Sequence, residues 1–176
     1  MRRALIIHPD SRCAAVSGIE AEVACPRPGQ MALTYRIAGL MSGVRLPTAT
    51  PPERTDGLWR RTCFEAFVGA GSAYLEFNFA PSTQWAAYRF TGYRDGMTPA
   101  SDITPRLIDV TTDERSFELQ VLLDLPPDTA GRLGLSAVIE ETGGGLSYWA
   151  LAHPPGKPDF HHSAALAVDL PPSDIP

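Results

Sequence analysis

Short runs in which apolar and polar residues alternate recur along the chain. Four of them span residues 19–23, 31–37, 117–123 and 133–139. A period of two is the pattern of a β-strand that turns one face to a core and the other to a wetter environment. A helix of more than two turns fits nowhere convincingly, so this alternation constrains the fold more than any other feature.

Glycine and proline are frequent, with 15 and 17 copies in 176 residues. So many breakers favour short strands joined by frequent turns. Residues 113–114 and the glycines at 143–145 lie where hairpin turns are expected. The sequence therefore predicts an all-β fold, an antiparallel β-sandwich of about ten strands with less than about one residue in ten in helix.

Length and composition indicate one ordered domain. Of the 176 residues, 44% are hydrophobic and 20% are charged, which excludes disorder for the chain as a whole. We expect a single domain over residues 1–170 and a proline-rich tail over residues 171–176. The net charge of −5, without a long Lys/Arg run, makes nucleic acid and anionic membranes poor partners.

The N-terminus contains only a short apolar stretch, Ala4–Ile7, which is too short for the core of a signal peptide. No run approaches the roughly 20 residues of a membrane span. The sequence thus predicts a cytoplasmic protein. Cys13, Cys25 and Cys63 have no metal-like spacing, and we expect reduced thiols.

Residues 58–93 form an aromatic-rich centre that reads as three strands, roughly over residues 62–68, 73–79 and 84–90. On the second strand, alternate positions place Leu75, Phe77 and Phe79 on one face and Tyr74, Glu76 and Asn78 on the other. On the first strand, Phe64 and Glu65 likewise point to opposite faces.

Glu65 and Glu76 pair directly if residues 69–72 form a four-residue turn. Like charges directly opposite each other destabilise a sheet by up to about 1 kcal/mol. We therefore expect another group to offset this repulsion. It could be an arginine, with Arg61 or Arg89 as first candidates, a bound cation, a hydroxyl-rich ligand, or a proton shared between the carboxylates, one of which would have a raised pKa. A register slip of two changes the pairing but keeps both carboxylates on one face.

Two interpretations of this centre remain open. In the first, arginines make ordinary ion pairs with the carboxylates. In the second, carboxylate, amide and aromatic side chains line a shallow groove on the outer face, as sugars require for their hydroxyls and their apolar C–H faces. The candidate groove residues are Glu65, Glu76, Asn78, Trp59, Tyr74, Trp85 and Tyr88.

Three segments, GLWRRTCFEAF, YLEFNFAPSTQWAAYRFTGYRDGM and SYWALAHPPGKPDFHHSAALAVDL, resemble the DOMON-like proteins of bacteria, and the similarity extends over about residues 5–170. The resemblance is carried by Trp59, Phe64, Glu65 and Phe67 together with the strand Glu76–Phe79. It implies a β-sandwich of immunoglobulin-like or jelly-roll type. It also implies a ligand-binding ancestry shared with DOMON domains and family 9 carbohydrate-binding modules, which bind haem or sugars.

The C-terminal loop concentrates His153, His161 and His162 with Asp159. A metal site is disfavoured, because adjacent histidines on a strand point to opposite faces. Either one histidine packs inward while the loop closes one end of the sandwich, or the loop contacts a ligand in the same groove as the carboxylates. His161 is the candidate ligand contact.

The function predicted is a ligand-binding module for a small molecule or saccharide, with no catalytic residue, metal or cofactor of its own and with its oligomeric state open. One alternative is haem binding, although no Met–His pair on neighbouring strands can be read from the sequence. The other is a glycan-processing enzyme that uses Glu65 and Glu76, since such enzymes need two carboxylates about 5–10 Å apart. No Gly-x-Ser-x-Gly elbow or phosphate-binding glycine loop occurs.

Overall fold

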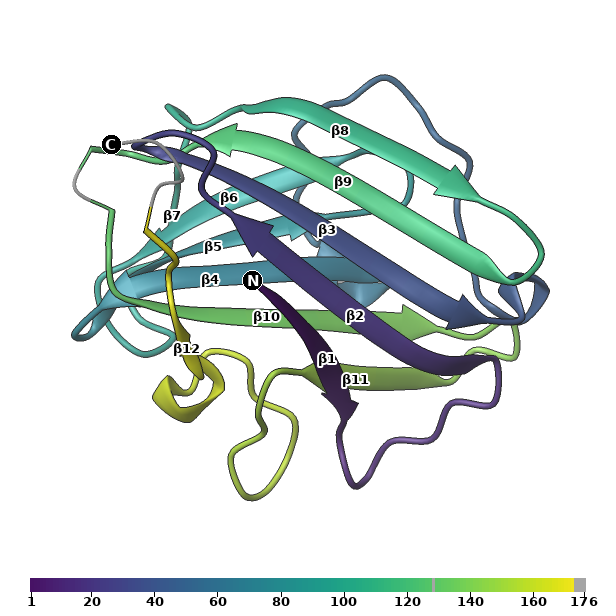
Figure 1. Ribbon diagram of the computed structural model, residues 1–176. Coiled ribbons are helices and arrows are strands. Elements are labelled where there is room, and N and C mark those ends of the chain that lie inside the picture. Colours follow the sequence, from purple (N-terminus) through teal and green to yellow (C-terminus); the bar gives the residue numbers. More distant parts are fainter. Residues whose placement is uncertain (128, 173–176) are drawn as a thin grey trace.

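The computed structural model describes residues 1–127 and 129–172, which form one curled antiparallel sheet (Figure 1). Twelve strands occur in this part of the chain: β1 (Arg2–Ile7), β2 (Val16–Ala24), β3 (Gln30–Gly39), β4 (Cys63–Ala70), β5 (Ala73–Phe79), β6 (Trp85–Phe90), β7 (Thr98–Pro99), β8 (Pro105–Thr112), β9 (Ser116–Asp124), β10 (Arg132–Glu140), β11 (Leu146–Ala150) and β12 (Val168–Asp169).

Eleven strands follow one another in the order β7-β6-β5-β4-β10-β11-β1-β2-β3-β9-β8, and β12 pairs with β10. The predicted all-β antiparallel class is confirmed. Helix is confined, within the described residues, to three short 3₁₀ helices, η1 (Met41–Gly43), η2 (Leu58–Arg60) and η3 (Ser163–Ala165). None of the described helices has the length and apolar character needed to cross a membrane.

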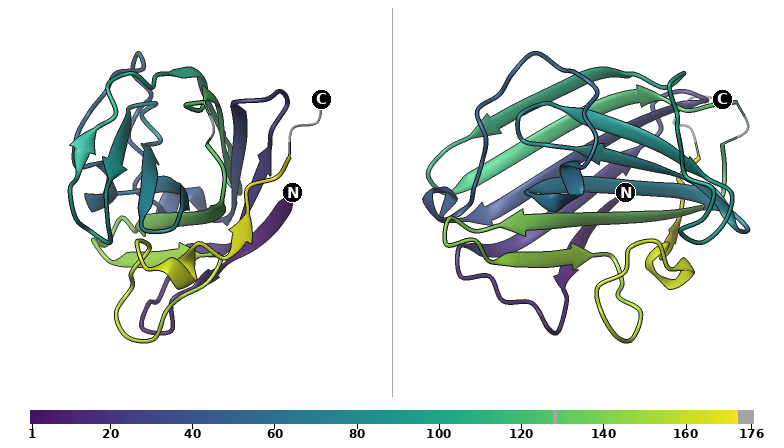
Figure 2. Two further views of the ribbon diagram at one scale, coloured as in Figure 1. Left: turned by 90° about the vertical axis from the view of Figure 1, so that its left-hand side faces the viewer. Right: turned by 180° about the vertical axis from the view of Figure 1, so that it is seen from behind.

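The sheet is continuous, whereas the sequence predicted the two separate sheets of a sandwich. Strand β1 pairs with β2 on one side and with β11 on the other, and so joins the two halves. Figure 2 shows how the sheet curls until the two halves face each other across the core. The strand number exceeds about ten because β7 and β12 have two residues each, too few to give a periodic signal.

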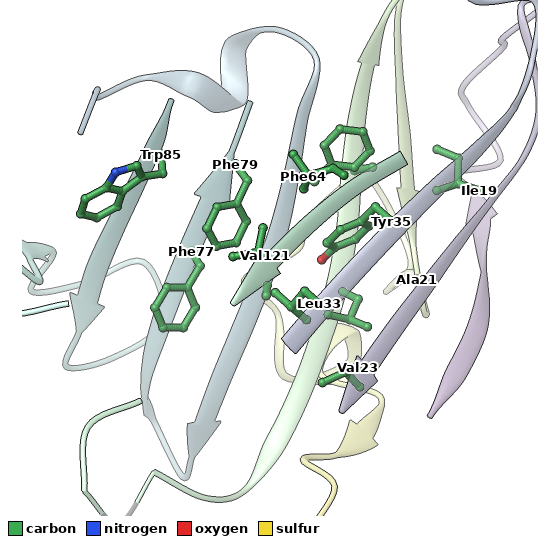
Figure 3. Close-up of a cluster of buried hydrophobic side chains, with 14 of the residues drawn as sticks. Ile19, Ala21, Val23, Leu33, Tyr35, Phe64, Phe77, Phe79, Trp85 and Val121 are labelled. Atoms are coloured by element: carbon green, nitrogen blue, oxygen red, sulfur yellow. The ribbon is translucent and has the colours of Figure 1, made fainter. Parts of the chain in front are cut away.

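The alternating residues predicted to face inward form the core between the two halves. Figure 3 shows Tyr35 of β3 beside Phe64 of β4, with Phe77 and Phe79 of β5 close by. The rings of Phe64 and Phe117 stack with centroids 5.4 Å apart. The Tyr35 hydroxyl donates a buried hydrogen bond of 2.6 Å to the backbone carbonyl of Glu65, which ties β3 to the opposite half of the sheet.

The outer face of β4, β5, β6 and β10 is also covered. A second apolar cluster gathers side chains of these strands, such as Phe67 and Val138, with Leu58 of η2 and with Phe160 and Leu166 of the C-terminal segment. That segment runs along the outside of the sheet near β10 and β11 (yellow in Figure 1). Of the two interpretations of this loop, closure of one end of the fold or contact with the groove of the carboxylates, the first does not match its packing on a sheet face.

The β4–β5 turn is shorter than predicted. Gly69 pairs with Tyr74, and only residues 71–72 remain outside the ladder. Gly71 adopts a φ of 67°, which favours glycine at a tight turn. Gly69 is still part of strand β4 and lies very close to Tyr74 of β5. A Cβ on Gly69 would lie only 2.5 Å from the Tyr74 Cβ, which favours glycine at this position. The register thus slips by two, and Glu65 faces Asn78 rather than Glu76.

Replacement of Gly69 by alanine tests this close approach. The added Cβ would meet the Ala73 carbonyl oxygen at 2.4 Å, so we expect Gly69→Ala to lower the free energy of unfolding by about 1–3 kcal/mol. Urea denaturation followed by circular dichroism measures this change. Gly143→Ala is the control, because its Cβ would have no atom within 4 Å. Equal effects of both substitutions would contradict the prediction.

The division into a domain over residues 1–170 and a tail over residues 171–176 stays a prediction. Residues 173–176 of that tail lie outside the described residues.

Candidate functional site

Three adjacent strands, β4, β5 and β10, position the polar side chains of the site. Glu65 of β4 lies between Asn78 of β5 and Ser136 of β10 in the ladder. Glu76 is two positions from Asn78 on the same strand and therefore shares its face, while Phe64 and Phe77 point into the core. The predicted assignment of faces is confirmed. As diagonal neighbours, Glu65 and Glu76 have side chains roughly 7–8 Å apart at their base.

The carboxylates open into a cavity of about 440 Å³ rather than a shallow surface groove. Glu65 and Glu76 are only 3% and 5% exposed, because the C-terminal segment covers this face. We call this space the carboxylate cavity. Its lining comprises Trp59, Glu65, Glu76, Phe90, Arg94, Met97, Val138, Tyr148, Pro158, Phe160 and His161.

Neutral donors hold both carboxylates. The Ser136 hydroxyl donates to Oε2 of Glu65 at 3.2 Å, and the Asn78 side-chain amide donates to Oε1 of Glu76 at 2.6 Å. The Cys63 thiol lies 3.5 Å from the Asn78 carbonyl oxygen and orients this amide. Two buried polar groups thus lie on this outer face, one of Ser136 and Glu65 and the other of Cys63, Asn78 and Glu76.

Burial raises the pKa of both carboxyl groups. For Glu65 the loss of hydration comes first and the charge of Glu76 second, and together they place its pKa well above the usual 4.5 despite the bond from Ser136. For Glu76, burial raises the pKa and the bond from Asn78 opposes part of this rise. Burial therefore shifts both groups towards the protonated form, which donates as well as accepts hydrogen bonds.

Among the described residues no arginine bridges the two carboxylates, so the alternative with Arg61 or Arg89 as their partner is wrong. Arg61, which follows η2, instead forms an ion pair with Glu140, whose Oε1 lies 2.8 Å from its Nη1. Arg89 pairs with Leu75 in the ladder and so lies on the opposite face from Glu76. There it makes two hydrogen bonds, of 2.7 Å and 2.6 Å, to Asp102.

His161 closes the cavity beside Glu76. The backbone N–H of Arg94 donates to the Tyr74 oxygen at 3.2 Å, and this oxygen lies 2.8 Å from Nδ1 of His161. Nδ1 of His161 is therefore engaged with the Tyr74 hydroxyl, and Nε2 is the ring nitrogen on the side of Glu76. Nε2 lies 3.8 Å from Oε2 of Glu76. Burial, followed by the charge of Arg94, lowers the pKa of His161 to about 4, so the ring is neutral near pH 7.

A second cavity of about 400 Å³ adjoins the first and shares His161 with it. Its walls include Tyr74, Tyr93 and Arg132, together with the β4–β5 turn. The hydrogen-bonded pair Tyr74 and His161 therefore lies at the boundary of the two cavities.

The structure brings together four of the eight predicted site residues in the carboxylate cavity, namely Trp59, Glu65, Glu76 and His161. Asn78 and Tyr74 stand behind them and hold Glu76 and His161 by hydrogen bonds.

The two remaining predicted residues do not line the cavity. Tyr88 supports the edge of Trp59 with ring centroids 6.0 Å apart, and its hydroxyl donates to Asp56. Trp85 was predicted as a platform for a sugar ring, and this placement is wrong. It pairs with Phe79 and so points into the core, as Figure 3 shows.

Sequence reasoning missed several lining residues. Val138 falls on the outward positions of its alternating run, and an apolar side chain there was a signal that something covers this face. Phe90 and Tyr148 carry the same signal on neighbouring strands. Arg94 and Met97 lie in the connection between β6 and β7, where no periodic pattern indicates their position.

Within residues 1–127 and 129–172, no group of three or more His, Cys, Asp or Glu side chains is arranged to hold a metal ion.

Comparison with known proteins shows that this chain is similar in fold to one solved structure. No protein-family model and no curated protein matches the chain, so its resemblance to DOMON-like proteins stays a prediction. Among solved structures, the chain is similar to a candidate carbohydrate-binding protein from Bacteroides uniformis. The TM-score is 0.61 and the sequence identity 12%, over 94% of this chain and 83% of the other.

The buried carboxyl groups predict an unusual dependence of stability on pH. The folded-state pKa of Glu65 lies above its unfolded value, so the folded state retains this proton to higher pH than the unfolded state does. Ionisation of Glu65 therefore destabilises the folded state. This destabilisation is absent below about pH 4, where Glu65 is protonated in both states, and it grows as pH rises towards the folded-state pKa of Glu65. We therefore expect Glu65→Gln to stabilise the protein by about 1–3 kcal/mol at neutral pH and by almost nothing near pH 4.

Urea unfolding at several pH values between these limits measures the effect. Glu114→Gln is the control, because Glu114 is an exposed residue of the turn between β8 and β9. A stability gain in Glu65→Gln that is equal at all pH values would show that the buried charge is not its cause.

Proposed function

We propose that the protein is a saccharide-binding module and that the carboxylate cavity is its binding site. The observation that carries this proposal is the combination in one cavity of buried carboxyl groups, a neutral histidine and four aromatic rings. Protein sites for small ligands commonly pair an apolar wall with a few placed polar groups.

The polar groups match the chemistry of sugar hydroxyls. A hydroxyl donates one hydrogen bond and accepts others, and a protonated carboxyl group can do both in return. Glu65 and Glu76 offer two carboxyl groups from one side of the cavity, and Nε2 of His161 adds a polar atom beside them. Asn78 and Ser136 orient the two carboxyl groups and so reduce the ordering that a ligand must impose.

Trp59 supplies a surface for the apolar face of a sugar ring. It belongs to η2, is 36% exposed and lines the cavity. Its position is supported from behind by Tyr88. An aromatic ring that is both accessible and held in place can stack on sugar C–H groups with little loss of side-chain entropy.

The comparison with the Bacteroides uniformis structure agrees with this proposal. That protein is described as a candidate carbohydrate-binding protein, and the likeness extends over nearly the whole of this chain. At 12% identity it supports a shared fold, and the proposed ligand class rests on the cavity itself.

Haem binding is a second candidate function, because Met97 and His161 both line the carboxylate cavity. Iron ligation by His161 would require Nδ1 to leave Tyr74 or Nε2 to turn from Glu76. Added haem tests this alternative. A Soret band that is lost in Met97→Ala and in His161→Ala would support it, and the absence of a band would exclude it.

Calorimetric titration with a panel of mono- and disaccharides tests the proposed function. We expect at least one sugar to bind with a dissociation constant in the millimolar range or below, and Glu76→Gln to weaken it by about tenfold through loss of a hydrogen bond to a carboxyl group. Trp59→Ala should weaken binding to a similar extent, whereas Leu40→Ala, which removes an exposed side chain elsewhere, should not.

Absence of binding across the whole panel would overturn the proposal. Release of a shortened glycan during the titration, abolished in Glu65→Gln, would instead indicate the enzymatic alternative.

A further inference from the structure

In the part of the chain that the structure describes, the carboxylate cavity contains two buried carboxyl groups without a cationic partner. Glu65 and Glu76 both line it, and among the described residues no lysine or arginine forms an ion pair with either of them. The hydrogen bonds that they accept come from the neutral side chains of Ser136 and Asn78. Burial without a cation shifts such groups towards their neutral form, and a cation brought by a ligand would instead stabilise their ionised form.

The positive charge that lies nearest is already engaged. Nη2 of Arg94, which lines the cavity, lies 2.8 Å from Oδ1 of Asp159. The Tyr93 hydroxyl donates to the other oxygen of that carboxylate. Arg94 still lowers the pKa of both glutamates through space, but its guanidinium makes no contact with them.

The other titratable groups around the carboxyl pair supply no cation. Among the described residues they include Tyr35 of β3, Cys63 of β4, Tyr74 of β5, Tyr88 of β6, Tyr148 of β11 and His161 of the C-terminal segment. The thiol and the phenols are neutral when protonated. His161 has a pKa lowered to about 4 and is therefore also neutral at physiological pH.

The remaining walls of the cavity suit a cation as well. Trp59, Phe90, Tyr148 and Phe160 line it, and aromatic faces attract ammonium groups within about 6 Å of the ring centre. A neutral sugar would use these rings only for its C–H groups, whereas a charged amine would interact both with the rings and with the carboxylates.

From this geometry we propose that the cavity selects an amino sugar with a free ammonium group, which would bind between the carboxylates of Glu65 and Glu76 and the aromatic wall. The inference rests on the proposed saccharide-binding function and names its ligand class. Acetylation of the amine removes the charge and should remove the selectivity. An ammonium ion also favours the ionised carboxylates, so binding should release protons from the protein.

Titration with three matched ligands, D-glucosamine, D-glucose and N-acetyl-D-glucosamine, tests the inference. At about pH 6 the amine is fully charged. We expect glucosamine to bind at least about tenfold more tightly than either neutral sugar, as one charge-assisted contact would produce. Repeating the titration in buffers of different ionisation enthalpy should reveal proton release with glucosamine and none with glucose.

Two variants connect the selectivity with the carboxyl pair. In Glu76→Gln and in Glu65→Gln the ratio of glucosamine to glucose affinity should fall towards one, while Glu114→Gln on the surface should keep the wild-type ratio. Thermal unfolding of each variant verifies that it is folded, and either of the two cavity variants suffices for the test.

The possible outcomes separate this inference from the proposed function. Equal affinity for glucosamine and glucose, or equal affinity for glucosamine and its acetylated form, would overturn the inference and leave saccharide binding intact. Failure of every sugar to bind would overturn both. Binding of ethanolamine as tightly as glucosamine would show that the cavity recognises an amine alone, which also contradicts an amino-sugar site.

Discussion

Burial of both faces of the strand layer β4, β5 and β10 is the constraint on which the rest of the structure depends. The inner face packs across the curled sheet, where Phe64 meets Phe117 and Tyr35 reaches the backbone of Glu65. The outer face packs beneath η2 and the C-terminal segment through Phe67 and Phe160. The polar side chains in the middle of these strands, such as Glu65, Asn78 and Ser136, are consequently removed from water.

This burial determines the chemistry of the carboxyl groups. The arginines nearest in sequence bind acids elsewhere, Arg61 at Glu140 and Arg89 at Asp102. Glu65 therefore depends on the neutral donor Ser136, and its pKa rises because hydration is lost and Glu76 is near. The cost of holding these groups in a folded protein is what makes the cavity suited to a ligand that restores hydrogen bonds or charge.

Much of the site followed from the period of the strands. Because side chains alternate strictly along a strand, the predicted pairing and the observed one, which differs by two residues, both place Glu65 and Glu76 on one face. The direct pairing of Glu65 with Glu76 was wrong, because Gly69 looked like a turn residue and in fact lets Tyr74 pass closely over the ladder. Trp85 was wrongly placed on the outer face. It pairs with the core residue Phe79 and therefore points inward, and this pairing cannot be read from the pattern of one strand alone.

By itself the sequence determined the all-β class, the antiparallel hairpins and the faces of the central strands, since these depend on local alternation and on turn residues. Only the tertiary structure decided that one sheet curls continuously through β1 and that the C-terminal segment covers the outer face. It also decided that Arg94 and His161 meet at the cavity. These features depend on contacts between residues far apart in the chain, and neither periodicity nor local propensity carries information about such contacts.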